Sequence, residues 1–228
     1  MTALEMAGAV PPIPADRLRA AGVIPVVEIE DDGLAVDLAQ ALEAGGLPIV
    51  EVTFRTESAS NAIRLIARAA PHVFLIAGTV TSTRQADIAR DAGAEMIVAP
   101  GLNRAVVEHA MRIGIPMLPG VCTPSEVDAA ISLGLAAVKL FPIEPIGGVR
   151  YLKALAGPYP TMTWAPTGGI TAEALPGYLN IDSVLACGGS WVAPRADIAA
   201  KRFEEISARA AAAVEIVRQA RAGKGGTS

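Results

Sequence analysis

Two charged side chains interrupt apolar runs that otherwise have the composition of buried strands. Glu51 lies within residues 48–54 (Pro-Ile-Val-Glu-Val-Thr-Phe), and Lys139 lies within residues 136–141 (Ala-Ala-Val-Lys-Leu-Phe). Removal from water favours the uncharged form of a lysine, and that amine is the nucleophile that attacks a ketone to form a Schiff base. Because an imine catalyst also needs a group that moves protons, the two residues predict imine chemistry on a carbonyl substrate. The alternative is that Lys139 only pairs with Glu51 across a core and takes part in no reaction.

The segment around Glu51 adds a hydroxyl and a guanidinium to the same predicted strand face. Side chains alternate across a strand, so Glu51, Thr53 and Arg55 are expected to point one way and the apolar residues between them the other way. Polar groups that point into a core are unfavourable unless they are paired. The planar fork of Arg55 suits a substrate carboxylate, and Glu51 is then the proton-transfer group. The alternative is a Glu51–Arg55 ion pair with a structural role.

Two glycine pairs end the last two apolar runs, at residues 167–169 (Thr-Gly-Gly) and 188–190 (Gly-Gly-Ser). Glycine permits close approach to the backbone, and loops at such positions often bind phosphate through N–H groups. Ser190 adds a hydroxyl, so this region is a candidate phosphate site, with ordinary turns as the alternative. Thr79 and Pro100 end two earlier runs, where Thr79 could donate a hydrogen bond to a carboxylate and Pro100 could shape an apolar wall.

Eight apolar runs alternate with segments of helical periodicity, which predicts an α/β fold with parallel strands. A single (β/α)₈ TIM barrel over residues 22–195 is favoured over an open doubly wound sheet, which usually has fewer strands. We expect residues 13–21 to form an N-terminal helix that caps the barrel, residues 197–221 to form one long C-terminal helix, and residues 222–228 to be disordered, all within one domain spanning 1–228. The apolar runs are 23–29, 48–54, 73–79, 95–100, 116–121, 136–141, 162–167 and 183–189.

Composition narrows the class of protein further. A net charge of −4 argues against a nucleic-acid partner, and no apolar stretch is long enough to span a membrane. The two cysteines, Cys122 and Cys187, lie in apolar runs, which is typical of a reduced, cytoplasmic protein. The two histidines, His72 and His109, are expected to be solvated, and the two cysteines are too isolated to form a zinc set, so we expect neither a metal site nor a bound cofactor.

Six segments, in this order along the chain, resemble the motifs of the 2-keto-3-deoxy-6-phosphogluconate (KDPG) aldolases, a family that includes 4-hydroxy-2-oxoglutarate (KHG) aldolases. The resemblance covers residues 18 to 215. The segments are 51–56 (Glu-Val-Thr-Phe-Arg-Thr), 77–80 (Ala-Gly-Thr-Val), 99–102 (Ala-Pro-Gly-Leu), 138–142 (Val-Lys-Leu-Phe-Pro), 166–170 (Pro-Thr-Gly-Gly-Ile) and 188–191 (Gly-Gly-Ser-Trp).

The resemblance implies a trimeric, metal-free class I aldolase of the Entner–Doudoroff pathway, which cleaves KDPG to pyruvate and glyceraldehyde 3-phosphate. By motif position, Lys139 is the Schiff-base residue and Glu51 the general acid/base. The other positions implied to contact substrate are Arg55 and Thr79 for the carboxylate, Pro100 and Phe141 for the pocket wall, Thr167 for the C4 configuration, and Gly168, Gly169, Gly189 and Ser190 for the phosphate.

Glu28 departs from the family pattern, since many relatives carry arginine or a neutral residue there. A carboxylate that points into the barrel mouth would repel a phosphate, which leaves room for a shorter 2-keto acid. Cleavage of 4-hydroxy-2-oxoglutarate and decarboxylation of oxaloacetate are therefore alternative activities. A barrel that binds phosphosugars without catalysis is a further alternative.

Overall fold

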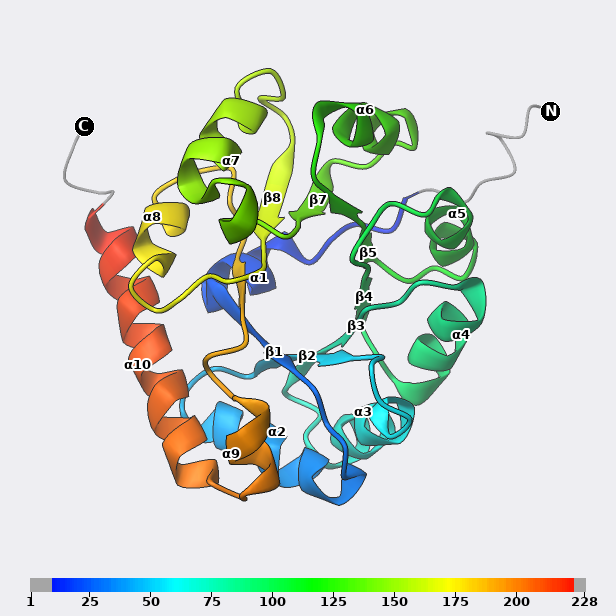
Figure 1. Ribbon diagram of the computed structural model, residues 1–228. Helices are drawn as coiled ribbons and strands as arrows, with labels where there is room; N and C mark the ends of the chain where they lie inside the picture. Colours follow the sequence, from blue (N-terminus) through cyan, green and yellow to red (C-terminus); the bar gives the residue numbers. More distant parts are fainter. Residues whose placement is uncertain (1–9, 224–228) are drawn as a thin grey trace.

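The computed structural model describes residues 10–223 of the chain (Figure 1). Within this part, parallel strands form a six-stranded sheet, in the order β5-β4-β3-β2-β1-β9, and a three-stranded sheet, in the order β6-β7-β8. The strands are β1 (Val23–Val27), β2 (Ile49–Thr53), β3 (Phe74–Gly78), β4 (Met96–Val98), β5 (Met117–Leu118), β6 (Gly120–Val121), β7 (Ala137–Leu140), β8 (Thr163–Pro166) and β9 (Cys187–Gly189).

Each of the eight apolar runs contains a strand, but the run at 116–121 is divided into β5 and β6. Pro119 separates them; proline has no N–H for a strand ladder, while its carbonyl still accepts a 2.9 Å hydrogen bond from Lys139 N. Strands β1 and β9, the first and last within residues 10–223, are paired, and isolated bridges connect Trp164 with Val184 and Thr167 with Gly188. The strands therefore curve around a shared interior, with α2 to α10 around them (Figure 1).

Most helices follow a strand and lie on the outer side of the sheets, whereas α1 lies within the ring of strands in the view of Figure 1. Their ends follow local signals: Thr123 and Glu126 form a capping box at the start of α6, and Gly93, with a φ of 103°, follows α4 in the left-handed conformation. The helices are α1 (Ala15–Ala21), α2 (Ala35–Ala44), α3 (Ala59–Ala69), α4 (Thr83–Ala92), α5 (Arg104–Arg112), α6 (Pro124–Ser132), α7 (Gly148–Ala156), α8 (Leu175–Leu179), α9 (Arg195–Ala199) and α10 (Phe203–Ala222), with 3₁₀ turns η1 (Asp32–Leu34) and η2 (Glu144–Ile146).

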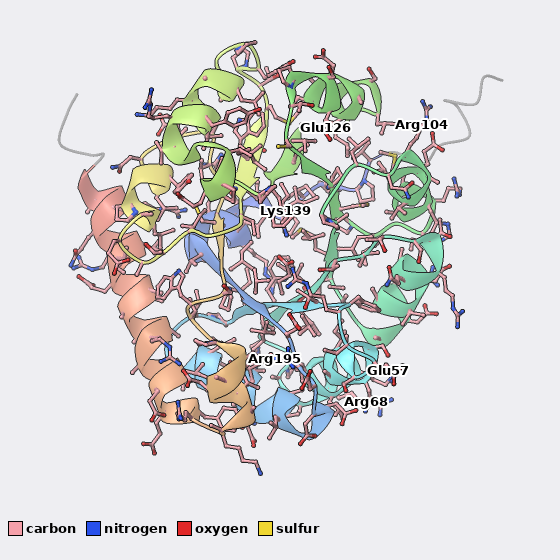
Figure 2. The ribbon with its side chains drawn as sticks, viewed as in Figure 1. Glu57, Arg68, Arg104, Glu126, Lys139 and Arg195 are labelled. Atoms are coloured by element: carbon pink, nitrogen blue, oxygen red, sulfur yellow. The ribbon has the colours of Figure 1, made fainter. Side chains whose placement is uncertain are left out.

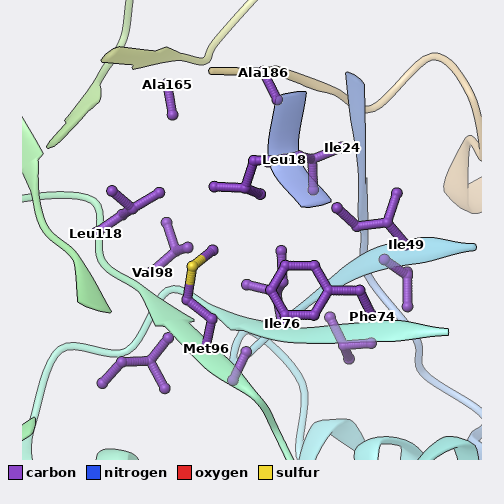
Figure 3. Packing of buried hydrophobic residues seen from close by; sticks show 14 of the residues in the cluster. Leu18, Ile24, Ile49, Phe74, Ile76, Met96, Val98, Leu118, Ala165 and Ala186 are labelled. Carbon is purple, nitrogen blue, oxygen red and sulfur yellow. The ribbon is translucent and has the colours of Figure 1, made fainter. Parts of the chain in front are cut away.

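The interior of the sheets is a packed apolar core rather than a channel. Figure 3 shows Leu18, from α1, in the same group of buried side chains as Ile24, Phe74 and Met96 from β1, β3 and β4. Leu18 has no exposed surface, so α1 contributes its one buried residue directly to this group. The core therefore fills the amino-terminal part of the strand interior and leaves the polar side chains to the opposite end.

The expected continuous helix over 197–221 is wrong, because the chain forms two helices, α9 and α10. Lys201, between them, has a φ of 56°. Asp197 is only 9% exposed, and its carboxylate accepts hydrogen bonds from Arg202 and Arg209. This buried charge needs its partners, and the break that brings Arg202 back to Asp197 overrides the helical propensity of the alanine-rich segment.

The end of the chain was expected to be disordered from residue 222. Ala222 is instead the last residue of α10, and residues 224–228 lie outside the described residues. Within the described range, the helices are all too short or too polar to cross a membrane.

Candidate active site

Lys139 and Glu51 lie in contact although they are 88 residues apart in the chain. Lys139 Nζ, from β7, is 3.4 Å from Glu51 Oε1, from β2, and the two side chains are only 7% and 3% exposed. Figure 2 shows Lys139 in the interior surrounded by the strands. The structure thus brings together the amine and the carboxylate that the two apolar runs singled out.

Small residues on the neighbouring strands make room for the lysine. Lys139 is in register with Gly120 on one side and Ala165 on the other. Its amino group lies 5.4 Å from the centre of the ring of Phe141, the residue that directly follows β7. Side chains two apart in a strand share a face, so Lys139 and Phe141 point into the same space.

Gly78 is a site residue that the sequence did not suggest. A Cβ atom at this position would lie 2.2 Å from Glu51 Oε1 and 2.6 Å from its Cγ, so the carboxylate occupies the space where a side chain of β3 would be. The only signal in the sequence is a glycine that precedes Thr79 at the end of an apolar run, and only the tertiary structure shows which residue it accommodates.

Gly78→Ala is therefore expected to affect activity more than stability. The new methyl group displaces the buried Glu51 side chain, and a displacement of about 1 Å in a catalytic group can cost roughly 10²-fold in rate. Steady-state kcat and a thermal melt measure the two effects. Gly223→Ala is the control, since a Cβ there meets nothing within 4 Å. A kcat equal to that of the wild type would show that Glu51 is not held in place by this contact.

A cavity of about 530 Å³ opens above the Lys139–Glu51 pair, at the carboxyl ends of the strands. The wall of this cavity includes Thr53, two residues after Glu51, and Phe141, two residues after Lys139. Because side chains two apart share a strand face, Glu51 and Lys139 lie below the cavity, toward the amino-terminal ends of the strands. Six predicted substrate contacts, Arg55, Phe141, Thr167, Gly168, Gly169 and Ser190, belong to the lining, together with Glu28, Gly188, Trp191 and Arg195.

The two glycines of the 167–169 loop need their lack of a side chain. Gly168 and Gly169 have φ values of 107° and 86°, and a Cβ on Gly169 would lie 2.9 Å from Glu144 Cβ. Glu144 supports this loop from behind, because its N–H donates to Gly168 O at 3.0 Å and its carboxylate accepts from the Tyr178 hydroxyl at 2.5 Å. Burial and this hydrogen bond raise the pKa of Tyr178, so the hydroxyl stays a donor.

Three other predicted residues lie outside the cavity lining. Thr79 follows β3 and has a φ of 59°, which is unusual for a threonine. Such strained backbone conformations are often found at functional sites. The Pro100 carbonyl lies against Gly120, where a Cβ would be only 2.1 Å from that oxygen. Gly189 packs against the Trp191 indole, whose Nε1 would be 2.8 Å from a Cβ there.

Arg55 pairs with Glu28 and not with Glu51, so the interpretation as a Glu51–Arg55 ion pair is wrong. Arg55 Nη1 lies 3.2 Å from Glu28 Oε2, and Arg195 Nη1 lies 3.5 Å from Glu28 Oε1. Arg195 also forms an ion pair with Glu30. Glu28 lies just beyond the end of β1 and lines the cavity, and two guanidinium groups offset its charge.

Comparison with known sequences gives consistent matches over most of the chain. The family model for KDPG and KHG aldolase matches residues 15–209. The 2-dehydro-3-deoxy-phosphogluconate aldolase of Treponema pallidum is 43% identical over 202 residues, which are 89% of this chain and 96% of the relative. The KHG/KDPG aldolase of Escherichia coli is 40% identical over 193 residues, which are 85% of this chain and 91% of the relative.

Solved structures agree with the sequence comparison. The KDPG aldolase of Zymomonas mobilis, solved with 3-phosphoglycerate, has a TM-score of 0.81 and 41% identity and covers 88% of this chain and 95% of its own. The KDPG aldolase of Legionella pneumophila, in which pyruvate was captured as a covalent carbinolamine, has a TM-score of 0.85 and 34% identity, covering 89% and 98%. The chain therefore belongs to the KDPG and KHG aldolase family.

Proposed function

We propose that this chain is a class I aldolase that cleaves KDPG to pyruvate and glyceraldehyde 3-phosphate through a Schiff base on Lys139. The observation that carries the proposal is the buried contact of 3.4 Å between Lys139 Nζ and Glu51 Oε1 below a cavity at the strand ends. The covalent pyruvate carbinolamine of the Legionella pneumophila relative supports the same type of intermediate.

The reaction follows from the chemistry of the pair. The uncharged Lys139 amine adds to the C2 ketone to give a carbinolamine, which loses water and becomes an iminium ion. Glu51 removes the proton of the C4 hydroxyl, directly or through a water molecule. The C3–C4 bond then breaks and glyceraldehyde 3-phosphate leaves. The electron pair of the broken bond moves toward the iminium, which becomes an enamine. Protonation at C3 and hydrolysis release pyruvate and the free lysine.

The remaining residues are proposed to hold the two ends of the substrate. Arg55 and Thr79 bind the carboxylate, and Pro100 and Phe141 form the wall beside the carbon chain. Thr167 selects the C4 configuration. Backbone N–H groups bind the phosphate with the Ser190 hydroxyl, because the glycines of both loops permit close approach. The residues of these loops are Gly168, Gly169, Gly189 and Ser190.

We also infer that the two sheets close into one (β/α)₈ barrel in a single domain over 1–228, with α1 as its cap. The pairing of β1 with β9, the bridges between the β8 and β9 segments, and the single residue between β5 and β6 support closure. A homotrimer in the cytoplasm is proposed from the resemblance to the family.

A comparison of substrates tests the proposed function. KDPG is expected to exceed 4-hydroxy-2-oxoglutarate and oxaloacetate in kcat/KM by about 10- to 100-fold. This is the effect of one or two charge-assisted hydrogen bonds to a phosphate, at about 1.5–3 kcal/mol. Coupled assays of pyruvate release measure all three reactions.

The same assays, run with EDTA, test the metal-free mechanism, because the iminium replaces a metal as the electron sink. Equal turnover with and without the chelator is expected. A preference for a shorter 2-keto acid would support the alternatives considered because of Glu28, which are cleavage of 4-hydroxy-2-oxoglutarate and decarboxylation of oxaloacetate. Absence of pyruvate release from every substrate would support a barrel that only binds ligands, and inhibition by EDTA would contradict the Schiff-base mechanism.

A further inference from the structure

Arg195 lies at the mouth of the cavity but has no role in the proposed reaction. It is the first residue of α9, five residues after Ser190, and both residues line the cavity. Figure 2 shows Arg195 between α9 and β1. Arg195 therefore lines the same cavity as the loop that is proposed to bind the phosphate.

The charges around the mouth are arranged so that a second anion can enter. Among the cavity-lining residues, Glu28 carries one negative charge and is shared by two cations, Arg55 and Arg195. These three groups together have a net charge of +1, which becomes zero when Glu30, the other ion-pair partner of Arg195, is counted. The repulsion that an isolated Glu28 would exert on a phosphate is thereby offset, and the two arginines stay at opposite oxygens of one carboxylate.

We propose that Arg195 determines specificity by binding the terminal anion of the substrate, with Glu28 holding Arg195 and Arg55 in place until the ligand displaces it. This inference rests on the proposed function, since it assigns a contact for the distal end of that substrate. Arg55 then turns to the keto-acid carboxylate and Arg195 to the phosphoryl group, and Glu28 is left to solvent.

The exchange is favourable because the existing ion pairs are weak. The side chains of Arg55 and Arg195 are 51% and 58% exposed. An exposed ion pair changes an equilibrium constant by about fivefold at most, whereas a charge-assisted hydrogen bond to a phosphate is worth about 10- to 100-fold. An arginine can also bind a phosphate through two parallel N–H donors. Arg195 instead donates a single hydrogen bond to Glu28.

Condensation of pyruvate with two aldehydes tests this inference. Arg195→Ala is expected to raise KM for glyceraldehyde 3-phosphate by about 10-fold or more with little change in kcat, and to leave reaction with uncharged glyceraldehyde unaffected. Arg195→Lys, which keeps the charge but loses the planar fork, is expected to fall between wild type and alanine. Arg104→Ala, which removes an exposed arginine of α5, is the control.

A second variant separates binding from a structural role. Glu30→Gln removes the outer partner of Arg195 without changing a cavity residue. If Arg195 only joined α9 to the β1 loop, this variant would raise KM as Arg195→Ala does; the inference predicts an unchanged or lower KM for the phosphorylated aldehyde.

Binding can also be measured without turnover. Trp191 lines the cavity, so its fluorescence is expected to report titration with inorganic phosphate, with weaker binding in Arg195→Ala. Equal effects of Arg195→Ala on both aldehydes, or no effect on either, would overturn this inference and leave the proposed function intact. A wild-type protein that condenses neither aldehyde with pyruvate would instead contradict the proposed function.

Discussion

Replacement of Lys139 by methionine is expected to abolish aldol cleavage, with a loss on the order of 10⁵-fold or more, the scale found when a covalent nucleophile is removed. Methionine is unbranched and fills a similar volume, so the packing beside Gly120 and Ala165 is retained. Among the residues that line the cavity, the only cations are the guanidinium groups of Arg55 and Arg195, and these are not nucleophiles.

Trapping with borohydride measures the covalent step itself. Pyruvate and borohydride are expected to leave one reduced adduct on the wild-type chain, with peptide mapping to Lys139, and none on Lys139→Met. Lys153→Met is the matched control because it removes an exposed lysine of α7 and is expected to keep both adduct and turnover. Residual turnover near the wild-type value in Lys139→Met, or an adduct mapped to a different lysine, would show that the covalent residue is misassigned.

The stability of this variant has to be measured beside its activity. Removal of one partner of a buried ion pair typically costs about 3–5 kcal/mol, because the other charge is left unpaired. Glu51 is 2% exposed, so replacement of Lys139 leaves its carboxylate as a buried charge without this partner. The double variant Lys139→Met, Glu51→Gln removes both charges, and it is expected to recover stability without any recovery of turnover. A thermal melt of the three proteins separates loss of folding from loss of chemistry.

Much of the fold could be predicted because its signals are local. A strand buried on both faces needs a continuous apolar run, and a helix that covers it needs apolar residues at helical spacing, so the alternation along the chain follows from burial alone. Glu51 and Lys139 stand out for the same reason, since a charge in such a run must have a partner. Alternation within a strand then predicts that both side chains point into the interior, where they meet.

The features that were missed depend on contacts between distant segments. Glu28 lies past the end of β1, where strand alternation no longer predicts direction, so its pairing with Arg55 and Arg195 could not be inferred. The break between α9 and α10 depends on the burial of Asp197. For Gly78, the sequence shows only a glycine at the end of an apolar run, because the atom that excludes a side chain there belongs to Glu51 on the neighbouring strand.

Glu51→Gln is expected to lower kcat by about 10²- to 10⁴-fold, the usual contribution of a positioned acid/base group. Glutamine has the shape of glutamate, so Gly78 still accommodates it, but it neither accepts the C4 hydroxyl proton nor returns one at C3. Imine formation is expected to be slowed less than cleavage, because the amine that attacks the ketone is still present. Borohydride trapping of pyruvate and single-turnover cleavage of KDPG measure the two steps separately.

Exchange of the pyruvate methyl protons with deuterated water isolates the role of Glu51 from that of the leaving aldehyde. Enamine formation from pyruvate needs a base at C3 but no C4 hydroxyl, so Glu51→Gln is expected to slow exchange while the adduct still forms. Glu43→Gln, an exposed carboxylate on α2, is the control. Glu51→Asp keeps the carboxylate but withdraws it by one methylene from a contact that is already 3.4 Å long, so its activity is expected between glutamine and wild type. If Glu51→Gln exchanged and cleaved at the wild-type rate, Glu51 would serve only to pair with the lysine, and the proton would have to move through another group.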